Sequence, residues 1–548
     1  MHLTATFATV PLSLRTASPP SLCHRLNCRT CATAHKACMP VARAAVTRVV
    51  EHSTSLTAVS LTRGDSYTSA PLMLFDLAAA GSASGLPTRL RKLAVDFRAD
   101  DPLQLRMLQE YTSLTCLDIV RIQIGEWHTQ YVKASAVALK EAFQSLLSLK
   151  FLRLQHCRLK REGTAALASA LQALTQLQHL LLPSNELRRA GVAALVPALS
   201  AMPGLQTVDV SSNHLYGVKG VKVLCALLDV VPGLTHLDVG KNSLREDAAL
   251  LAPALRCLTC LRVLNMSNVC IGDKDMDALA PALAALPHLH TLDVSRNDLR
   301  SEAMFALQQV LAREGSPLHK LDISWNWCRS KSACAVAAGL SASLQLQVLN
   351  LEGADWGKEG WAALGPALSR LAPTLQSLRL HSYSSRSGTA GTAVAAADAL
   401  QALTGLTLLQ APRIFASVDM EAVTPALMGM VRLQYLNLAQ TPMGVEGTAA
   451  FAKVLPAFAS SLKFLNLSQC SIDAEAASRV LAPTLAQVTG LAGLYLHHHD
   501  VGPQGAQWLV SLLSTLPHLR TIGLCSCGLG VQGCMAIVQA VKERDEYE

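Results

Sequence analysis

Leucines recur along most of the chain at a fixed spacing. From Leu149 to Leu159, apolar residues occupy the first, fourth, sixth and eleventh positions, and Cys157 occupies the ninth. The same spacing begins again at Leu177, Leu205, Leu234, Leu261, Leu289, Leu318, Leu346, Leu375, Leu406, Leu433, Leu462, Leu491 and Leu519, which makes fourteen units at intervals of 27 to 31 residues. A sustained period of this length predicts a stacked-repeat architecture.

Each unit is predicted to contain a short strand followed by a helix. Alternating leucines place apolar side chains on one face of a strand. The ninth position holds a small polar side chain, such as Asn185 or Asn213, which can turn inward and satisfy backbone groups where the chain leaves the strand. The second half of a unit, for example Gly191–Met202, has apolar residues at helical spacing and abundant alanine.

One such unit cannot bury its leucine face alone, so neighbouring units must stack. We therefore expect an α/β fold in which a parallel sheet lines the concave side and helices cover the convex side. The strand spacing and the period of 28 to 29 residues resemble leucine-rich repeats of the ribonuclease-inhibitor-like subtype, which also build the sensor domains of NOD-like receptors and the Ran GTPase-activating protein. The resemblance covers roughly residues 149–540 and implies a horseshoe-shaped solenoid; this scaffold serves many unrelated partners.

The units differ in regularity along the chain. Residues 1–40 are rich in Ser, Thr, Arg, Ala and Cys, lack acidic residues, and are predicted to be a flexible segment that resembles an organellar transit peptide. Residues 41–148 contain degenerate N-terminal repeats and a cap, with strand spacing at Leu56–Leu61, Leu90–Val95 and Leu114–Ile119. Residues 149–548 form the regular array, with an irregular stretch at 381–411 that is either a binding loop or a tolerated packing defect.

The fifth position of successive units is predicted to carry a polar stripe on the concave face. It holds, in order, Asp209, Asp238, Asn265, Asp293, Asp322 and Asn350. Neighbouring strands are ~4.8 Å apart, so the stripe would be ~24 Å long. Two like charges ~5 Å apart repel by ~1 kcal/mol in water. A partner with a basic surface would relieve that repulsion, although Asp and Asn are also common at this position of leucine-rich repeats generally.

A tryptophan is expected beside the stripe. Trp325, at the eighth position of its unit, should face the concavity near Asp322, Asp293 and Arg296. A tryptophan among charges is typical of an interface hot spot, and packing against a neighbouring ridge is the alternative. Trp356, by contrast, occupies a core position of its unit.

No catalytic, cofactor or metal signature is found. The chain lacks phosphate-binding loops, zinc-protease and nucleophile-elbow motifs. Three consecutive histidines begin at His497, but only alternate residues share a face, and His499 should turn inward. Cys23, Cys28, Cys31 and Cys38 lack a hydrophobic frame for a zinc knuckle. We predict a protein with no enzymatic activity and no cofactor.

Charge does not indicate a nucleic-acid partner. The net charge is +8, yet residues 1–50 hold six basic and no acidic side chains, which leaves the rest nearly balanced. The apolar stretches are too short to span a membrane. We expect a protein partner and no membrane association, with scattered reduced cysteines indicating an intracellular compartment. The cytoplasm is the favoured location and an organelle the alternative.

The sequence therefore predicts a non-enzymatic scaffold or receptor that binds a protein on its concave face. Two other functions stay open. One is a GTPase activator resembling the Ran GTPase-activating protein, although the chain ends in a short segment of mixed charge where that family has an acidic region. The other is a substrate receptor of a ubiquitin ligase, although residues 1–55 are too short and polar for a complete F-box.

Overall fold

The structure is a computed structural model of the whole chain. It describes residues 2–7, 58–63, 90–96, 107–121, 137–138, 140–313, 315–381, 390–415, 420–499, 501–502 and 505–547. The chain divides into two compact units. Unit 1 contains residues 1–270 with the short segment 286–288, and unit 2 contains residues 271–285 and 289–548.

Unit 1 contains nine described strands that pair in chain order, all in parallel. They are β1 (His2–Phe7), β2 (Ala58–Arg63), β3 (Lys92–Asp96), β4 (Cys116–Val120), β5 (Phe151–Gln155), β6 (His179–Leu181), β7 (Thr207–Asp209), β8 (His236–Asp238) and β9 (Val263–Asn265). The helices between them are η1 (Met107–Glu110), α6 (Lys160–Leu171), α7 (Arg188–Leu199), α8 (Gly217–Asp229), η2 (Arg245–Leu251) and α9 (Ala252–Cys257).

Unit 2 continues the alternation with nine further described strands, which also pair in parallel. They are β10 (Thr291–Asp293), β11 (Lys320–Asp322), β12 (Val348–Asn350), β13 (Ser377–Arg379), β14 (Leu408–Gln410), β15 (Tyr435–Asn437), β16 (Phe464–Asn466), β17 (Gly493–Tyr495) and β18 (Thr521–Gly523).

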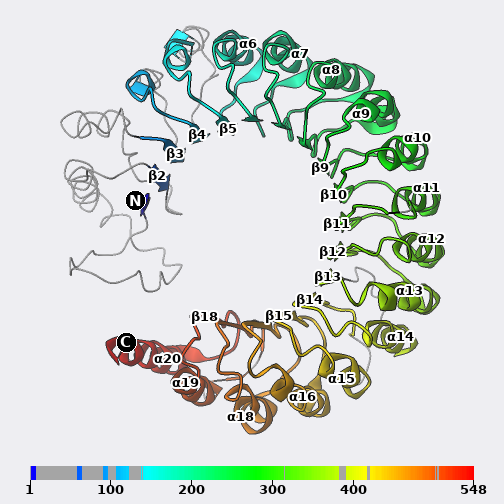
Figure 1. Cartoon of the computed structure of the whole chain (residues 1–548). Coiled ribbons are helices and arrows are strands. Elements are labelled where there is room, and N and C mark those ends of the chain that lie inside the picture. Colours follow the sequence, from blue (N-terminus) through cyan, green and yellow to red (C-terminus); the bar gives the residue numbers. More distant parts are fainter. Residues whose placement is uncertain are drawn as a thin grey trace. The chain divides into compact units, whose positions relative to one another are not determined.

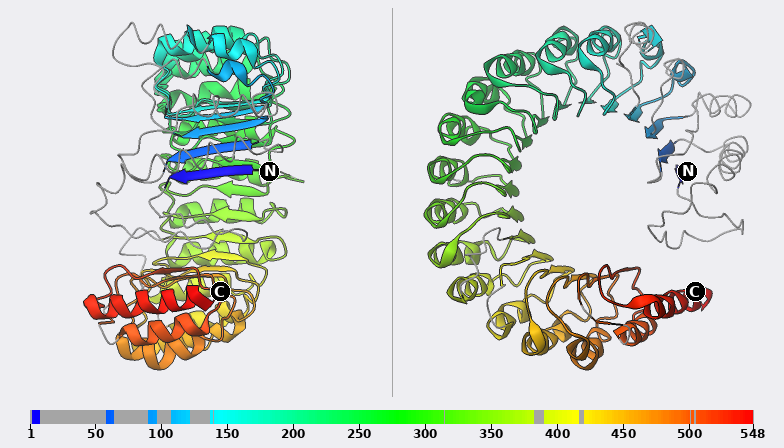
Figure 2. Two further views of the ribbon diagram at one scale, coloured as in Figure 1. Left: turned by 90° about the vertical axis from the view of Figure 1, so that its left-hand side faces the viewer. Right: turned by 180° about the vertical axis from the view of Figure 1, so that it is seen from behind.

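The helices of unit 2 are α10 (Asp273–Ala284), α11 (Ser301–Leu311), α12 (Ser330–Leu340), α13 (Gly357–Leu371), α14 (Ala390–Leu400), α15 (Met420–Met428), α16 (Gly444–Ala452), η3 (Leu455–Phe458), α17 (Ala474–Ala476), η4 (Ala477–Leu481), α18 (Ala482–Leu485), α19 (Gly505–Thr515) and α20 (Gly530–Tyr547). Within each unit the strands line the inner side of a curve and the helices its outer side (Figure 1). Figure 2 shows that neighbouring strands within each unit lie side by side. The predicted α/β solenoid is confirmed.

The repeat leucines form the core between sheet and helices. Leu237 is 2% exposed, and Leu292 and Leu349 are fully buried, as the strand register requires. Leu292, Leu321 and Leu349 occupy matching positions of paired strands, so each leucine stacks on the equivalent leucine of the next repeat. This continuous ridge is how stacking buries what one unit leaves exposed.

The ninth position of each unit closes the turn after the strand. Asn213 Nδ2 donates to the Leu182 carbonyl (2.8 Å), and its Oδ1 accepts from the backbone of Asn185 (2.9 Å). Asn326 bonds in the same way to the Val294 carbonyl and the Asn297 backbone. These amides are buried, so they satisfy backbone groups that water cannot reach. The sequence-based role of this position is confirmed.

Other residue types fill the same position with the same chemistry. The thiols of Cys470 and Cys527 donate to the carbonyls of Leu438 (3.3 Å) and Leu496 (3.0 Å). His499 is buried, with Nε2 bonded to the Leu467 carbonyl (2.7 Å) and Nδ1 accepting from the Ile472 backbone (3.2 Å). The inward position predicted for His499 is confirmed. All twelve described cysteines are free thiols.

The strands predicted in the degenerate N-terminal units are present in the structure. The strands β2, β3 and β4 overlap the three segments expected from the leucine spacing and pair in register with one another and with β5. The irregular stretch does not interrupt the ladder either, because β14 pairs with both β13 and β15. The repeat that begins at Leu406 lacks the last leucine of the pattern, and Phe415, one residue before that position, is fully buried. Residues 382–389, and the cysteine cluster from Cys23 to Cys38, lie outside the described residues.

Among the described residues, no helix has both the length and the apolar character needed to cross a membrane.

Candidate functional site

The polar stripe is present as two rows, one in each unit. In unit 1, Asp209 lies opposite Asp238, and Asp238 lies opposite Asn265. In unit 2, Asp293, Asp322 and Asn350 form the equivalent row. The strand register predicted from the leucines therefore places these side chains side by side within each unit.

Each member of these rows also has a structural role. Oδ1 of Asp209, Asp238 and Asp293 accepts a hydrogen bond from the backbone N–H two residues later, at 2.8 to 2.9 Å. Asp322 and Asn350 do the same at 3.0 and 3.1 Å. An aspartate or an asparagine oxygen can make this bond equally well. The fold thus explains a polar residue at the fifth position, but it does not explain a charge.

The asparagine at the end of each row donates a hydrogen bond that stabilises the carboxylate of the neighbouring aspartate. Asn265 Nδ2 donates to Asp238 Oδ2 (2.9 Å), and Asn350 Nδ2 donates to Asp322 Oδ2 (2.8 Å). The repulsion inferred from the sequence is therefore partly relieved within the protein itself. Asp293 has no such donor among the described residues. Burial raises the pKa of Asp293 above its ordinary value, the hydrogen bonds from Ser295 oppose the rise, and Asp322 adds to it.

Trp325 is half-buried on the concave side of unit 2, among polar neighbours. The Arg296 guanidinium carbon lies 5.1 Å from the centre of its ring system, within cation–π range. The His381 ring centre lies 5.6 Å away, and the indole donates a hydrogen bond to the Glu352 side chain. Contacts on several sides hold the indole in one orientation.

Gly353 provides the space for this indole. A methyl group on Gly353 would lie 3.0 Å from Cδ2 and Cε3 of Trp325, closer than side-chain carbons normally pack. The backbone of Trp325 itself has a positive φ of 56°, as do Ser184, Lys241, Arg296 and Gln469 at the equivalent position of other repeats. Because residues this varied occupy the turn, the repeat does not need an indole there.

Three charged or titratable residues of this cluster were not identified from the sequence. They are Glu352, Arg379 and His381, which come from the two repeats after Trp325. Burial raises the pKa of Glu352, while the nearby Arg379 lowers it. Burial, with Arg413 nearby, lowers the pKa of His381. Their positions, fifth and seventh in the unit, are the signal that could have placed them on the concave face.

The sheet from β13 to β18 presents a different set of side chains. Arg379 lies on β13, Lys463 and Arg520 directly precede β16 and β18, and Arg413 lies in the turn after β14. The described part of these strands and turns has no Asp or Glu. Aromatic residues lie among them. Tyr435 and Phe464 occupy paired positions of β15 and β16, with ring centres 6.3 Å apart, and Tyr495 follows on β17.

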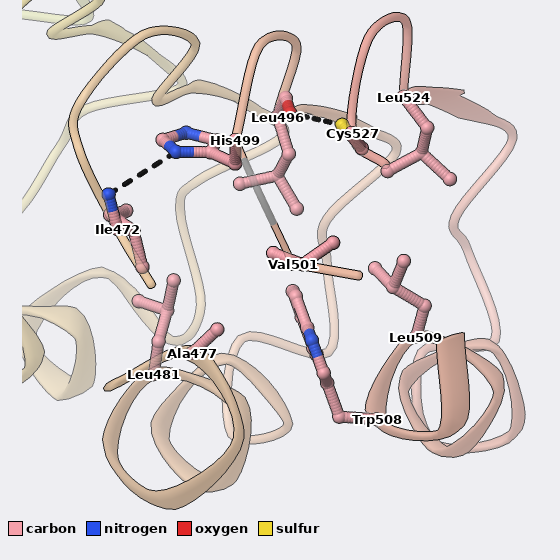
Figure 3. A pocket seen from close by; sticks show the side chains of 10 residues that line it. All are labelled: Ile472, Ala477, Leu481, Leu496, His499, Val501, Trp508, Leu509, Leu524 and Cys527. Atoms are coloured by element: carbon pink, nitrogen blue, oxygen red, sulfur yellow. Dashed lines mark hydrogen bonds between the residues drawn. The ribbon is translucent and has the colours of Figure 1, made fainter. Parts of the chain in front are cut away.

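A small apolar cavity lies beneath the last repeats. It is lined by ten residues, among them Leu481, Leu496, Trp508 and Leu509, with His499 at its margin (Figure 3). It has room for about one water molecule. Its lining side chains come from the repeat core, so we assign it to packing. Among the residues that the structure describes, no group of three or more His, Cys, Asp or Glu side chains is arranged to hold a metal ion.

Known proteins that are similar to this chain include a family model and two solved structures. A family model described as "Leucine Rich repeat" matches residues 257–280 and 285–307. An internalin (inlF) from Listeria monocytogenes has a similar structure, with 14% identity, coverage of 76% of this chain and 88% of the internalin, and a TM-score of 0.36. TLR13 in a complex with ssRNA13 is similar with 16% identity, coverage of 86% and 63%, and a TM-score of 0.42. No curated protein matches the sequence at a significant level. The chain is thus a solenoid that carries leucine-rich repeats.

Proposed function

We propose that this protein is a non-enzymatic scaffold or receptor that binds a protein partner on the concave face of its repeats. The observation that carries the proposal is that the Trp325 indole is both fixed in place and partly exposed on the concave face. The indole is held by Arg296, Glu352 and His381 and still keeps part of its surface open. A rigid, partly open tryptophan loses little conformational freedom on binding, which is why such residues dominate interface energies.

The aspartate row beside Trp325 supports a partner with basic groups. Asp293 and Asp322 lie side by side on β10 and β11, and Asn could supply the same turn hydrogen bond without charge. Oriented carboxylates on an open face attract a basic surface and raise its association rate. The partner proposed here is a protein that places a basic side chain over this row and an apolar group against Trp325.

The repeat length supports the ribonuclease-inhibitor-like subtype. Units of 27 to 31 residues, most with a full helix such as α12 or α13, match that description better than shorter repeats with irregular outer segments. Within this proposal the chain has no catalytic role, since the residues around Trp325 are arranged to bind rather than to react.

The test compares two tryptophans of one repeat. Trp325 lies on the concave face, whereas Trp327 is 59% exposed and donates only to Asp298 at 3.3 Å. A partner is isolated by affinity purification with mass spectrometry, and its Kd for the purified variants is then measured by calorimetry. Trp325→Ala should weaken binding by about 2 kcal/mol or more, which is about thirtyfold in Kd.

Trp327→Ala is the matched control and should leave the Kd unchanged. Both variants should melt close to the wild-type temperature, because neither ring fills the repeat core. A partner that binds Trp325→Ala as tightly as wild type would refute the concave face around Trp325 as its site.

A further inference from the structure

We propose that the concave face of β13–β18 binds an extended, acidic segment of a protein partner. This inference rests on the proposed function and names the chemistry that one part of the surface recognises. We call this part the basic–aromatic face and define it by Arg379, Arg413, Lys463, Arg520, Tyr435, Phe464 and Tyr495.

Charge is the first argument. Arg379, Lys463 and Arg520 are exposed, Arg413 is partly exposed, and none of the four forms an ion pair with another described residue. Glu352, which belongs to the neighbouring repeat of β12, lies near Arg379 at the edge of this face. The described part of β13–β18 and of their turns has no Asp or Glu. Four cations without ion-pair partners, with one acidic neighbour at the edge of the face, produce a positive potential that favours an anionic ligand.

The aromatic rings are the second argument. Phe464 lies against the backbone of the next strand, because a methyl group on Gly493 would come within 2.5 Å of Phe464 Cδ1. The rings of Tyr495 and His497 lie against Gly523 in the same way, because a methyl group on Gly523 would come within 2.8 Å of Tyr495 Cδ1. Each glycine leaves room for a ring to lie over the sheet. Phe464 remains 38% exposed and can receive an apolar side chain of a ligand.

The arrangement of the cations favours a peptide over a nucleic acid. Arg379 is at the fifth position of its unit, Arg413 at the eighth, and Lys463 and Arg520 at the second. The cations are therefore scattered across the width of the sheet, whereas a single-stranded nucleic acid needs a track of cations that follows its backbone. A peptide with a few carboxylates and one or two apolar side chains fits scattered cations around aromatic rings.

The size of the face sets the length of the ligand. Six strands at ~4.8 Å span ~24 Å, which an extended peptide of about seven residues covers at ~3.4 Å per residue. Such a peptide can place apolar side chains on Tyr435 and Phe464 and carboxylates near Arg379 and Lys463.

The test uses a defined probe. The probe is a fluorescein-labelled peptide of eight residues, Glu-Glu-Phe-Glu-Glu-Phe-Glu-Glu, and its binding to the full chain is followed by fluorescence anisotropy. Two comparison peptides carry Gln or Lys at each Glu position. A labelled oligothymidine of similar charge is measured in parallel. We expect the Glu peptide to bind, the Gln peptide to bind at least about tenfold more weakly, and the Lys peptide not to bind on this face.

Matched variants then locate the site. Arg379→Glu with Lys463→Glu should weaken the Glu peptide by about tenfold or more, and the same pair changed to Gln should weaken it less. The control, Lys358→Glu with Arg370→Glu, makes the same change of net charge on exposed positions of α13, on the helical side, and should leave binding unchanged. Melting curves establish that each variant is folded; the Gln pair replaces the Glu pair if charge reversal prevents folding.

Several outcomes would overturn the proposal. They are failure of the Glu peptide to bind, equal weakening by the α13 control, or oligothymidine binding more tightly than the peptide and being lost in the Arg379 and Lys463 variants. The last result would identify the ligand as a single-stranded nucleic acid. A natural partner that is sensitive to Trp325→Ala but not to the Arg379 and Lys463 variants would leave the proposed function standing and refute only this inference.

Discussion

The strands β10–β12 and β13–β18 belong to one sheet of unit 2, yet their concave surfaces differ in chemistry. The first region carries Asp293, Asp322 and Glu352 around a single tryptophan. The second region carries four basic side chains and three aromatic rings, with no acidic side chain in its described part. Beneath both, the same leucine ridge and the same turns repeat.

One pair of residues shows how the two surfaces can differ on a common scaffold. Asp322 Oδ1 accepts hydrogen bonds from the N–H and Oγ of Ser324, at 3.0 and 2.6 Å. Asn466 Oδ1 accepts the equivalent bonds from Ser468, at 3.0 and 2.7 Å. Both residues supply the acceptor oxygen for this turn bond, although other repeats, such as that of Arg379, have no acceptor oxygen at the fifth position. Charge on the concave face is therefore free to vary without cost to the turn.

The largest expected effect tests whether the core is common to both regions. Leu292 on β10 and Leu436 on β15 are each fully buried. Replacing either by Ala should lower the free energy of unfolding by ~2–5 kcal/mol, because a buried cavity replaces the side chain. Chemical denaturation of the two variants should give similar losses. An undiminished stability in Leu292→Ala would refute the strand register itself.

A smaller effect tests the shared role of the turn oxygens. Asp322→Ala and Asn466→Ala each remove the acceptor for a buried serine and its backbone N–H. Each should cost about 1 kcal/mol in the free energy of unfolding. Asp322→Asn should cost less than Asp322→Ala, because its Oδ1 can still accept the two bonds from Ser324. Equal losses for the two Asp322 variants would show that charge, rather than the turn bond, matters there.

The next effect depends on pH and separates charge from structure in the first region. Because burial raises the pKa of Asp293, the folded protein holds this proton more tightly than the unfolded chain. Stability from Asp293 is therefore present below its unfolded pKa and is lost as the pH rises through its folded pKa. Asp293→Asn keeps the bond to Ser295 and removes this loss. The melting temperature of the variant, relative to wild type, should rise between about pH 3 and pH 7. A constant difference would contradict the assignment.

The smallest effect concerns His499, which occupies a position that elsewhere holds Asn. Burial lowers the pKa of His499, so the unfolded chain takes up this proton first as the pH falls. Stability is lost below the unfolded pKa of the histidine. Asn in its place can donate to the Leu467 carbonyl and accept from Ile472 without titrating. His499→Asn should gain in melting temperature over wild type at about pH 5 compared with about pH 8. Equal differences at both values would contradict this role.

The sequence predicted the fold well because the repeat is local and redundant. Leucine spacing identified β5–β18, the burial of Leu237, Leu292 and Leu349, and the inward turn of His499. Each of these follows from alternation along a strand, and fourteen copies reinforce it. Trp356, expected in the core, is 2% exposed.

The surface was harder to predict because it depends on contacts between repeats. The strand register alone placed Asp293 and Asp322 side by side. It did not predict that the amides of Asn265 and Asn350 donate hydrogen bonds to Asp238 and Asp322. The partners of Trp325 come from neighbouring repeats and include Gly353, whose missing side chain accommodates the indole. No single-repeat pattern contains that information. The domain limits at residues 40 and 148 and the binding role of the site residues remain predictions.

The most direct test of the account is oxidative footprinting of the chain with its partner bound. Hydroxyl radicals modify exposed aromatic side chains, and mass spectrometry reads the rate at each residue. Partner binding should slow the oxidation of Trp325, Tyr435 and Phe464 on the concave face. Trp327, in the turn between β11 and α12, and Phe305, on α11, are 59% and 53% exposed and should be oxidised at the unbound rate. Protection of Trp327 and Phe305 with unchanged rates at Trp325 and Phe464 would contradict the concave face as the binding surface.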